Sequence, residues 1–361
     1  MNKPLLSICY PTYNRADIVY SNVDYILRNY EDDNIEVVVL NNNSEDDTEE
    51  KILSIKDERL VYYCNEKNIG SGANLLSVLR RAQAPYALLV SDEDVVDPGA
   101  IKHVITIIKR NPAIGMIYAG AEVGDLLWHE KSGKYRHRKA IEKLYKHTYM
   151  SGLIYNVKEV CYELDGVEDA HTIDNYGAGY GFLMLALLLA GKHGVICTDN
   201  VICKHIYEGT REFASLAYLK SKSNTEYELR LEQTQRYVDV LKRIPLSYVD
   251  KSIILNKVLA DFLIVISLSH VLSMKNPARF MTADGKSVTY PPMDLKYKPG
   301  RVSRLFAKEY YSYVFSSGLI SPTCLIQGAI MSPTICIESI LRVLVNIYRA
   351  EKMMKALKQR I

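Results

Sequence analysis

The first 120 residues alternate between short apolar runs and segments with helical periodicity. A strand that is buried on both faces appears in a sequence as a short continuous apolar run. Runs of this kind predict strands at residues 5–13, 34–43, 60–66 and 86–94. The segments between and after them predict amphipathic helices at residues 15–29, 44–56, 72–83 and 97–111. This alternation predicts an α/β fold, with a mostly parallel sheet that carries helices on both faces.

Three of the predicted strands carry a distinct cluster at their carboxyl ends. Pro11-Thr12 lies at the end of the first strand, the three asparagines 41–43 at the end of the second, and the three acids 92–94 at the end of the fourth. Ligands of open α/β sheets bind beyond the carboxyl ends of the strands. We therefore expect these three clusters to meet at one edge of the sheet.

Two helix starts carry capping signals. Asp97 and Pro98 occupy cap and first-turn positions of the helix at 97–111, and Ser44 is expected to cap the helix at 44–56.

The pattern changes after residue 120. Residues 121–150 are rich in charge and aromatics, and predict either a loop over the site or an inserted hairpin. A strand is expected within 151–160, a buried helix at 180–194 that ends in glycine, and a strand pair at 195–207. From about residue 215 the pattern is helical. We therefore expect two domains, an α/β domain at 1–214 and a mainly helical domain at 215–361.

Charge divides the chain in a similar way. The net charge is +3, but residues 1–210 hold 22 Lys and Arg against 30 Asp and Glu, and residues 211–361 hold 23 against 12. An acidic first part suits a cation, and a basic second part suits an anionic surface or ligand.

Seven cysteines without a CxxC pair indicate reduced thiols and no zinc site. The first residues lack the long apolar core of a signal peptide, and the apolar segment 252–274 contains Asn256, Lys257 and Asp261, which favours a core helix over a membrane span. We expect a cytoplasmic protein, with peripheral contact to the inner face of the membrane left open.

The acids Asp92, Glu93 and Asp94 suit a divalent cation. Along an extended segment alternate side chains share a face, so Asp92 and Asp94 are expected to point together while Glu93 points elsewhere. Mg²⁺ or Mn²⁺ takes one or two carboxylates, with phosphate oxygens completing its shell. The alternative is a solvated acidic turn.

The other two clusters suit a nucleoside. Asn41 and Asn42 offer donors and acceptors for a nucleobase edge, or form an Asn-rich turn. Arg15 is either a phosphate contact or a surface charge at a helix start.

Four stretches in order, SICYPTYNRAD, VVVLNNNSEDDT, NEKNIGSGANL and LLVSDEDVVDPGAI, carry a resemblance to a known family. The sequence resembles the family 2 glycosyltransferases of the GT-A fold, and is most similar to bacterial members that build surface polysaccharides. The resemblance covers about residues 4–120 well and continues less closely to about 210. It implies a Rossmann-like mixed sheet, a nucleotide-diphosphate sugar donor, Mn²⁺ or Mg²⁺ at Asp92-x-Asp94, and an inverting displacement with a carboxylate base.

The resemblance implies that 1–214 is the nucleotide-sugar-binding catalytic domain and that 215–361 serves acceptor, membrane-surface or oligomer contacts. It also implies site residues. Asp94 and Asp92 would hold the metal, Asp92 also facing the ribose, and His205 would complete the metal shell, unless it is an ordinary surface or core histidine. UDP is the expected nucleotide, with dTDP and GDP as alternatives. The residues expected around the nucleotide are Pro11, Thr12, Tyr13, Asn14, Arg15, Asn41, Asn42, Lys67, Asn68, Gly70, Asn74, Asp92, Glu93 and Arg211.

The sequence departs from the family pattern at two places. Asn41 stands where the family has an aspartate that accepts from the base, although its amide oxygen is also an acceptor. The acidic motif of the general base is not cleanly present. Asp174 is the first candidate for that base, with Glu168, Asp169 and His171 as alternatives.

The predicted function is transfer of a sugar from a nucleotide-diphosphate sugar to a glycan or lipid-linked acceptor. The alternatives are a nucleotidyltransferase, which usually has a Gly-rich loop that YPTYNRAD lacks, and a non-catalytic scaffold. The basic helix at 335–361 either lies on an anionic membrane or is an ordinary packed helix. Nucleic acid is not an expected partner, since no binding motif accompanies the charge. A homo-oligomer is left open.

Overall fold

The computed structural model describes residues 3–123, 126–165, 181–206, 226–275 and 299–323, together with 343–345, 348 and 352. The chain separates into two compact units. The described residues of the first unit lie within 1–210 and those of the second within 211–361. Each unit is described by itself.

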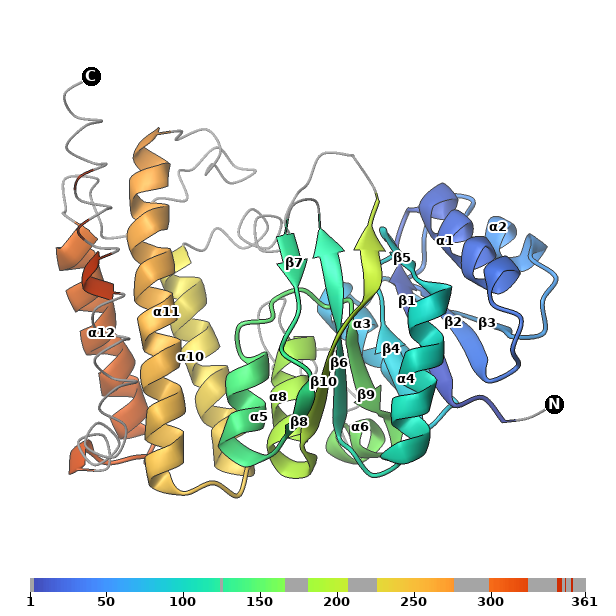
Figure 1. The fold of residues 1–361 in the computed structure, drawn as a ribbon. Helices are drawn as coiled ribbons and strands as arrows, with labels where there is room; N and C mark the ends of the chain where they lie inside the picture. Colours follow the sequence, from blue (N-terminus) through green and yellow to red (C-terminus); the bar gives the residue numbers. More distant parts are fainter. Residues whose placement is uncertain are drawn as a thin grey trace. The chain divides into compact units, whose positions relative to one another are not determined.

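The first unit is built on a mixed sheet with the strand order β3-β2-β1-β4-β9-β6-β10-β5 (Figure 1). β3, β2, β1 and β4 are parallel, β9 is antiparallel to both β4 and β6, and β10 is parallel to β6. β7 pairs with β6 and β8 with β10. The strands are β1 (Leu6–Thr12), β2 (Ile35–Asn41), β3 (Leu60–Cys64), β4 (Tyr86–Leu89), β5 (Asp94–Val96), β6 (Met116–Val123), β7 (Leu126–Trp128), β8 (Gly133–Tyr135), β9 (Leu153–Asn156) and β10 (Val195–His205).

Helices cover both faces of this sheet. Buried apolar residues of α1 (Ala16–Asn29), α2 (Thr48–Ser54) and α4 (Pro98–Arg110) form one core with the side chains that point to that face. On the other face α3 (Ser71–Arg81) packs on β1 and β2, and α6 (Val157–Glu163) and α8 (Gly181–His193) pack on β9 (Figure 1). α5 (His137–Leu144) packs against α8. The predicted α/β fold with helices on both faces is confirmed.

Central strands are buried on both faces, as their continuous apolar runs predict. Every residue of β1, β2 and β4 is buried, whereas β3 at the sheet edge is only partly buried. Alternate residues of a strand point to opposite faces, so Ile8, Tyr10 and Thr12 share the face that α1 and α4 cover.

One predicted cap is confirmed and one is wrong. The carboxylate of Asp97 accepts a hydrogen bond from the backbone N–H of Gly99 at 2.8 Å, with Pro98 at the first helical position. The helix predicted at 44–56 begins only at Thr48, so Ser44 does not cap it. Asp46 instead accepts from the backbone N–H and hydroxyl of Thr48.

Two segments differ in detail from their prediction. Residues 195–207 were expected to form a strand pair, but β10 is one strand with register shifts between Thr198 and Cys203. Within 121–150 the structure favours the inserted hairpin over the loop, because β7 folds back antiparallel on β6 and α5 follows β8.

The described part of the second unit is helical, as expected. α10 (Glu226–Arg243), α11 (Tyr248–Lys275) and α12 (Pro299–Ser316) pack on one another. Their contact is aromatic: Phe262 meets Tyr237 and Phe306 edge to face, with ring centroids 6.0 and 6.2 Å apart. None of the helices that the structure describes is both long and apolar enough to cross a membrane.

Candidate functional site

The three clusters predicted at strand ends lie at one edge of the sheet. The carboxyl ends of β1, β2, β4, β6 and β10 share this edge because these strands run in the same direction. β5 and β9 run the opposite way and therefore begin there. The edge brings together Thr12, the 91–94 turn, the loop before β9 and His205 at the end of β10. We call it the acidic rim.

The three acids form a turn, not the extended segment that was predicted. β4 ends at Leu89, the backbone N–H of Asp94 donates to the carbonyl oxygen of Ser91 at 2.9 Å, and Asp94 begins β5. Asp92 and Asp94 consequently have separate sets of partners. The chain itself supplies these partners.

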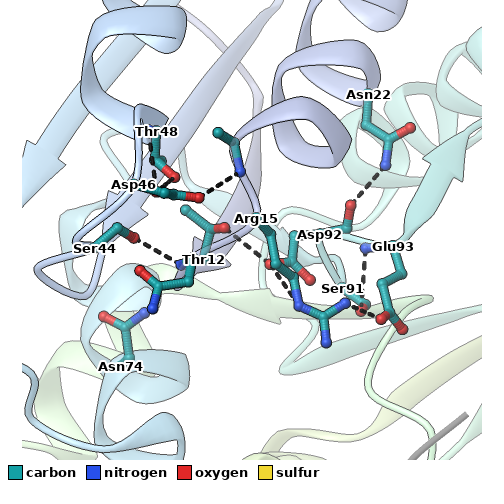
Figure 2. A network of polar contacts seen from close by, with 12 residues as sticks. Thr12, Arg15, Asn22, Ser44, Asp46, Thr48, Asn74, Ser91, Asp92 and Glu93 are labelled. Atoms are coloured by element: carbon teal, nitrogen blue, oxygen red, sulfur yellow. Dashed lines mark hydrogen bonds and ion pairs between the residues drawn. The ribbon is translucent and has the colours of Figure 1, made fainter. Parts of the chain in front are cut away.

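Asp92 lies against the end of β1 (Figure 2). The hydroxyl of Thr12 donates to its Oδ2 at 2.9 Å, and Nε of Arg15 lies 4.0 Å from the same oxygen. The side-chain amide of Asn22 donates to its backbone carbonyl at 2.7 Å. Burial raises the pKa of Asp92 to about 6, with Arg15 and Thr12 acting against that shift and Asp94 adding to it. Burial therefore disfavours the charged form of Asp92, and Arg15 and Thr12 offset only part of that cost.

Glu93 and Arg15 form an ion pair (Figure 2). Glu93 was expected to point away from the other groups of the site, yet it pairs with the guanidinium that also approaches Asp92. The Arg15 side chain is 40% exposed. Arg15 is therefore not an isolated surface charge. To contact a phosphate, its guanidinium would have to break the ion pair with Glu93.

Asp94 is enclosed by side chains that its own motif does not contain. The hydroxyl of Tyr149 lies 2.6 Å from both carboxylate oxygens, and that of Ser151 donates to Oδ2 at 2.5 Å. His205 Nδ1 lies 2.9 Å from Oδ1, and Asp94 pairs with His205 in the β5–β10 ladder. The structure therefore brings together Asp94 and His205, two of the predicted metal ligands, and adds Tyr149 and Ser151; the role of His205 at a metal stays a prediction.

The chemistry of these groups suits a hard divalent cation. Such an ion needs only one or two carboxylates when phosphate oxygens complete its shell. Asp92 accepts a side-chain hydrogen bond from Thr12 alone among the described residues, so it fits this role. No group of three or more His, Cys, Asp or Glu side chains in the described part of the chain is arranged around a metal position. A cation here would accordingly be shared between the rim carboxylates and a phosphorylated ligand.

The asparagines after β2 form a network of amides. The Asn41 amide oxygen accepts from the backbone N–H and hydroxyl of Ser44, and its nitrogen donates to the Tyr62 hydroxyl at 3.0 Å. Both lone pairs of that oxygen are used. The acceptor that was expected to meet a nucleobase is therefore occupied by Ser44.

Asn42 ties β2 to the loop before α3. Its amide nitrogen donates to Asn68 at 2.9 Å, and its oxygen accepts from Asn65 and from the backbone N–H of Ile69, both at 3.0 Å. Asn74 accepts from the same Asn65 amide at 2.9 Å. The segment predicted to close around the nucleotide is thus fastened to β2 through neutral groups, with Gly70 at a φ of +86° starting α3 and Lys67 exposed.

The loop after β1 is held by its neighbour after β2. The backbone N–H of Asn14 donates to the Ser44 hydroxyl at 2.9 Å, and the Asn14 side chain accepts from the backbone N–H of Glu45 at 2.8 Å. Pro11 is buried in β1, while Tyr13 is 39% exposed. Of these predicted nucleotide contacts, Tyr13 and Asn14 are exposed and Pro11 is not.

Several predicted residues lie outside the described part of the chain. They are the base candidates Glu168, Asp169, His171 and Asp174, and the predicted diphosphate contact Arg211. Their roles stay predictions.

Part of the chain matches a known protein family. Residues 7–161 match the sequence model of glycosyl transferase family 2. An uncharacterized glycosyltransferase of Rickettsia prowazekii is 34% identical over 125 residues, which make up 34% of this chain and 38% of that protein. One from Methanocaldococcus jannaschii is 25% identical over 153 residues, or 40% of this chain and 53% of that protein. The chain thus spans about half or less of the length of these relatives.

The fold matches solved structures along nearly the whole chain. S. aureus TarS 1–349, crystallised in complex with UDP-GlcNAc, superposes with a TM-score of 0.57 at 15% identity, covering 98% of this chain and 91% of that one. At this identity the likeness concerns the fold.

Proposed function

Because residues 7–161 belong to glycosyltransferase family 2, we propose that this protein is an inverting, cation-dependent glycosyltransferase. It transfers a sugar from a nucleotide-diphosphate sugar to a glycan or lipid-linked acceptor, in the synthesis of a bacterial surface polysaccharide. The observation that carries this proposal is the hydrogen bond between Thr12 and Asp92, 80 residues apart, because it joins the end of β1 to the acids inside the matched family segment.

The nucleotide side of the site lies along β1 and β2. Thr12, Pro11 and Tyr13 line the nucleoside, and the ring of Tyr13 offers an exposed face for stacking on a base. Asn41, held by hydrogen bonds to Ser44 and Tyr62, lines the nucleoside site beside these residues. Lys67, Asn68 and Gly70, with Asn74 behind, close over the nucleotide, and Arg211 pairs with the diphosphate.

The acidic rim serves the reacting end of the donor. Asp92 faces the ribose or the cation, and Asp94 and His205 stand beside it. A bound divalent cation supplies charge stabilisation to the leaving diphosphate. The acceptor hydroxyl must lose a proton as it attacks the anomeric carbon, and we assign that proton to Asp174, with Glu168, Asp169 and His171 as alternatives.

Binding calorimetry tests the donor site. Wild-type protein with Mn²⁺ is titrated with UDP, dTDP and GDP, and we expect binding of at least one of them. Asp92→Asn keeps an oxygen for Thr12 but loses the charge, and should weaken binding in the presence of Mn²⁺ about 10-fold or more. Asp97→Asn is the matched control, because asparagine caps helices as well as aspartate does, and it should bind as the wild type does.

The products separate this proposal from its alternatives. Incubation with the matching nucleotide sugar should release a nucleoside diphosphate, and the anomeric configuration of the transferred sugar, measured by NMR, should be inverted. Release of pyrophosphate would instead indicate nucleotidyl transfer. Absence of nucleotide binding to the wild type would favour a non-catalytic scaffold.

A further inference from the structure

Three side chains enclose the Asp94 carboxylate. The Tyr149 hydroxyl, which has one proton to donate, lies 2.6 Å from both oxygens, Ser151 donates to Oδ2 at 2.5 Å, and His205 Nδ1 lies 2.9 Å from Oδ1. The Asp94 side chain is 0% exposed. A cation can therefore reach Asp94 only if one of these groups leaves.

The three groups differ in how firmly the fold holds them. His205 sits opposite Asp94 in the β5–β10 ladder, so its backbone is fixed by sheet pairing. The Ser151 hydroxyl also accepts from the backbone N–H of Ser91 at 2.9 Å, which ties it to the same turn as the acids. Tyr149 packs against the core of the sheet, but its backbone lies in the connection between α5 and β9, outside any helix or strand. Tyr149 is thus the group that we expect to move, since the ladder fixes the backbone of His205 and the bond to Ser91 fixes Ser151.

We propose that Tyr149 is a positioning residue that competes with a divalent cation for Asp94. The proposal rests on the proposed function, since it concerns the cation that the acidic rim would bind. In the cation-free protein the hydroxyl satisfies a buried carboxylate that would otherwise be costly. When a cation takes that oxygen, the hydroxyl must move away, and the apparent affinity for the cation is lowered by the cost of that step.

The position of Trp128 makes this movement observable. Trp128 in β7 is stacked on Tyr149, with ring centroids 6.4 Å apart and an interplanar angle of 16°. It is the sole tryptophan of the chain. Withdrawal of the Tyr149 side chain changes the surroundings of that indole. Trp128 fluorescence therefore reports whether Tyr149 is in contact with Asp94.

The test compares Tyr149→Phe with the wild type. Phenylalanine keeps the ring that stacks on Trp128 and removes only the hydroxyl. The control is Tyr135→Phe, whose hydroxyl donates to the carbonyl of Lys131 at the opposite end of β10 and does not touch Asp94. Mn²⁺ affinity is measured by calorimetry with UDP present, and Mg²⁺ is added to a separate sample while Trp128 fluorescence is recorded.

We expect Tyr149→Phe to bind Mn²⁺ about 10-fold more tightly than the wild type, because a hydrogen bond to a charged group no longer has to be broken. Mg²⁺ with UDP should change the Trp128 emission of the wild type and of Tyr135→Phe. Equal or weaker Mn²⁺ binding by Tyr149→Phe, with the wild type binding normally, would overturn this inference alone. Absence of Mn²⁺ and UDP binding by both proteins would overturn the proposed function as well.

Discussion

The amide oxygen of Asn41 accepts two hydrogen bonds from Ser44, from its backbone N–H at 2.9 Å and from its hydroxyl at 2.6 Å. Asn41 is 1% exposed and stands at the end of β2. Its position in a nucleotide-binding motif suggested a contact with a base. The observed bonds show that it also anchors the loop after β2.

We predict that Asn41→Ala destabilises the first unit by about 2–3 kcal/mol, because it leaves the Ser44 N–H and the Tyr62 hydroxyl without their partner. Ser44→Ala removes only the hydroxyl and should cost about 1 kcal/mol. Urea unfolding followed by the fluorescence of Trp128 measures both free energies in this unit. Equal costs for the two variants would show that the amide is not the anchor.

The sequence predicted the sheet and its helices well because both depend on local pattern. The continuous apolar runs of β1, β2 and β4 correspond to burial on both faces, and the pairing of Asp97 with Pro98 located the start of α4. These features need no knowledge of distant contacts.

Two of the groups around Asp94 were missed for the opposite reason. Tyr149 and Ser151 are 55 and 57 residues from Asp94, and no spacing rule joins them to it. The three acids also looked like one extended segment, whereas the Asp94 N–H closes a turn with Ser91. The available signal for Tyr149 and Ser151 was their place just before a strand, β9, that begins at the acidic rim.

The Asp57–Arg59 pair gives a pH-dependent contribution to stability. Arg59 Nη2 lies 2.7 Å from Asp57 Oδ2, and Nη2 also donates to the carbonyl of Leu27 near the end of α1. The Arg59 hydrogen bond, opposed by burial, lowers the pKa of Asp57. A carboxyl whose folded-state pKa is lowered stabilises the protein above its unfolded pKa of about 3.9, and loses that contribution as pH falls through the folded value.

We therefore predict that Asp57→Asn costs about 1 kcal/mol at pH 7, and that the difference from the wild type shrinks below about pH 4. Urea unfolding at several pH values, followed by Trp128, measures it. Asp24→Asn is the control, since Asp24 pairs with a 73% exposed Arg28, and should cost less than about 0.5 kcal/mol. A pH-independent difference for Asp57→Asn would contradict the assignment.

Gly152 fixes the approach of the Tyr149 and Ser151 segment to β6. Its φ is +93°, and a Cβ added there would lie 2.1 Å from the backbone oxygen of Ala119. Gly70 has a similar φ of +86° but no heavy atom within 4 Å of such a Cβ. An alanine at either position would have an unfavourable φ, but only at Gly152 would its Cβ also clash with a neighbour. Comparing the two variants therefore separates the cost of backbone strain from that of the clash.

We predict a cost of about 3 kcal/mol or more for Gly152→Ala, and about 1 kcal/mol for Gly70→Ala. The free energy of unfolding, measured with Trp128, provides the comparison. Equal losses of unfolding free energy in the two variants would show that the close approach to Ala119 is not what requires glycine at position 152.

Tyr10 carries a fully buried hydroxyl for which the described residues provide no hydrogen-bond partner. Burial raises the pKa of Tyr10, and the nearby charges of Asp94 and Asp92 add to the shift, so the phenol stays neutral below the acidic rim. An unpaired buried hydroxyl costs about 1–3 kcal/mol. Tyr10→Phe should consequently stabilise the first unit by about 1 kcal/mol.

Tyr155 supplies the matched control for this last variant, because its equally buried hydroxyl donates to the carbonyl of Phe182 at 3.0 Å. Tyr155→Phe should destabilise the unit by about 1 kcal/mol, the opposite sign to Tyr10→Phe. Thermal and urea unfolding of both variants measure the two effects. A loss of stability in Tyr10→Phe would contradict the assignment, because it would mean that the buried hydroxyl is hydrogen-bonded in the folded protein.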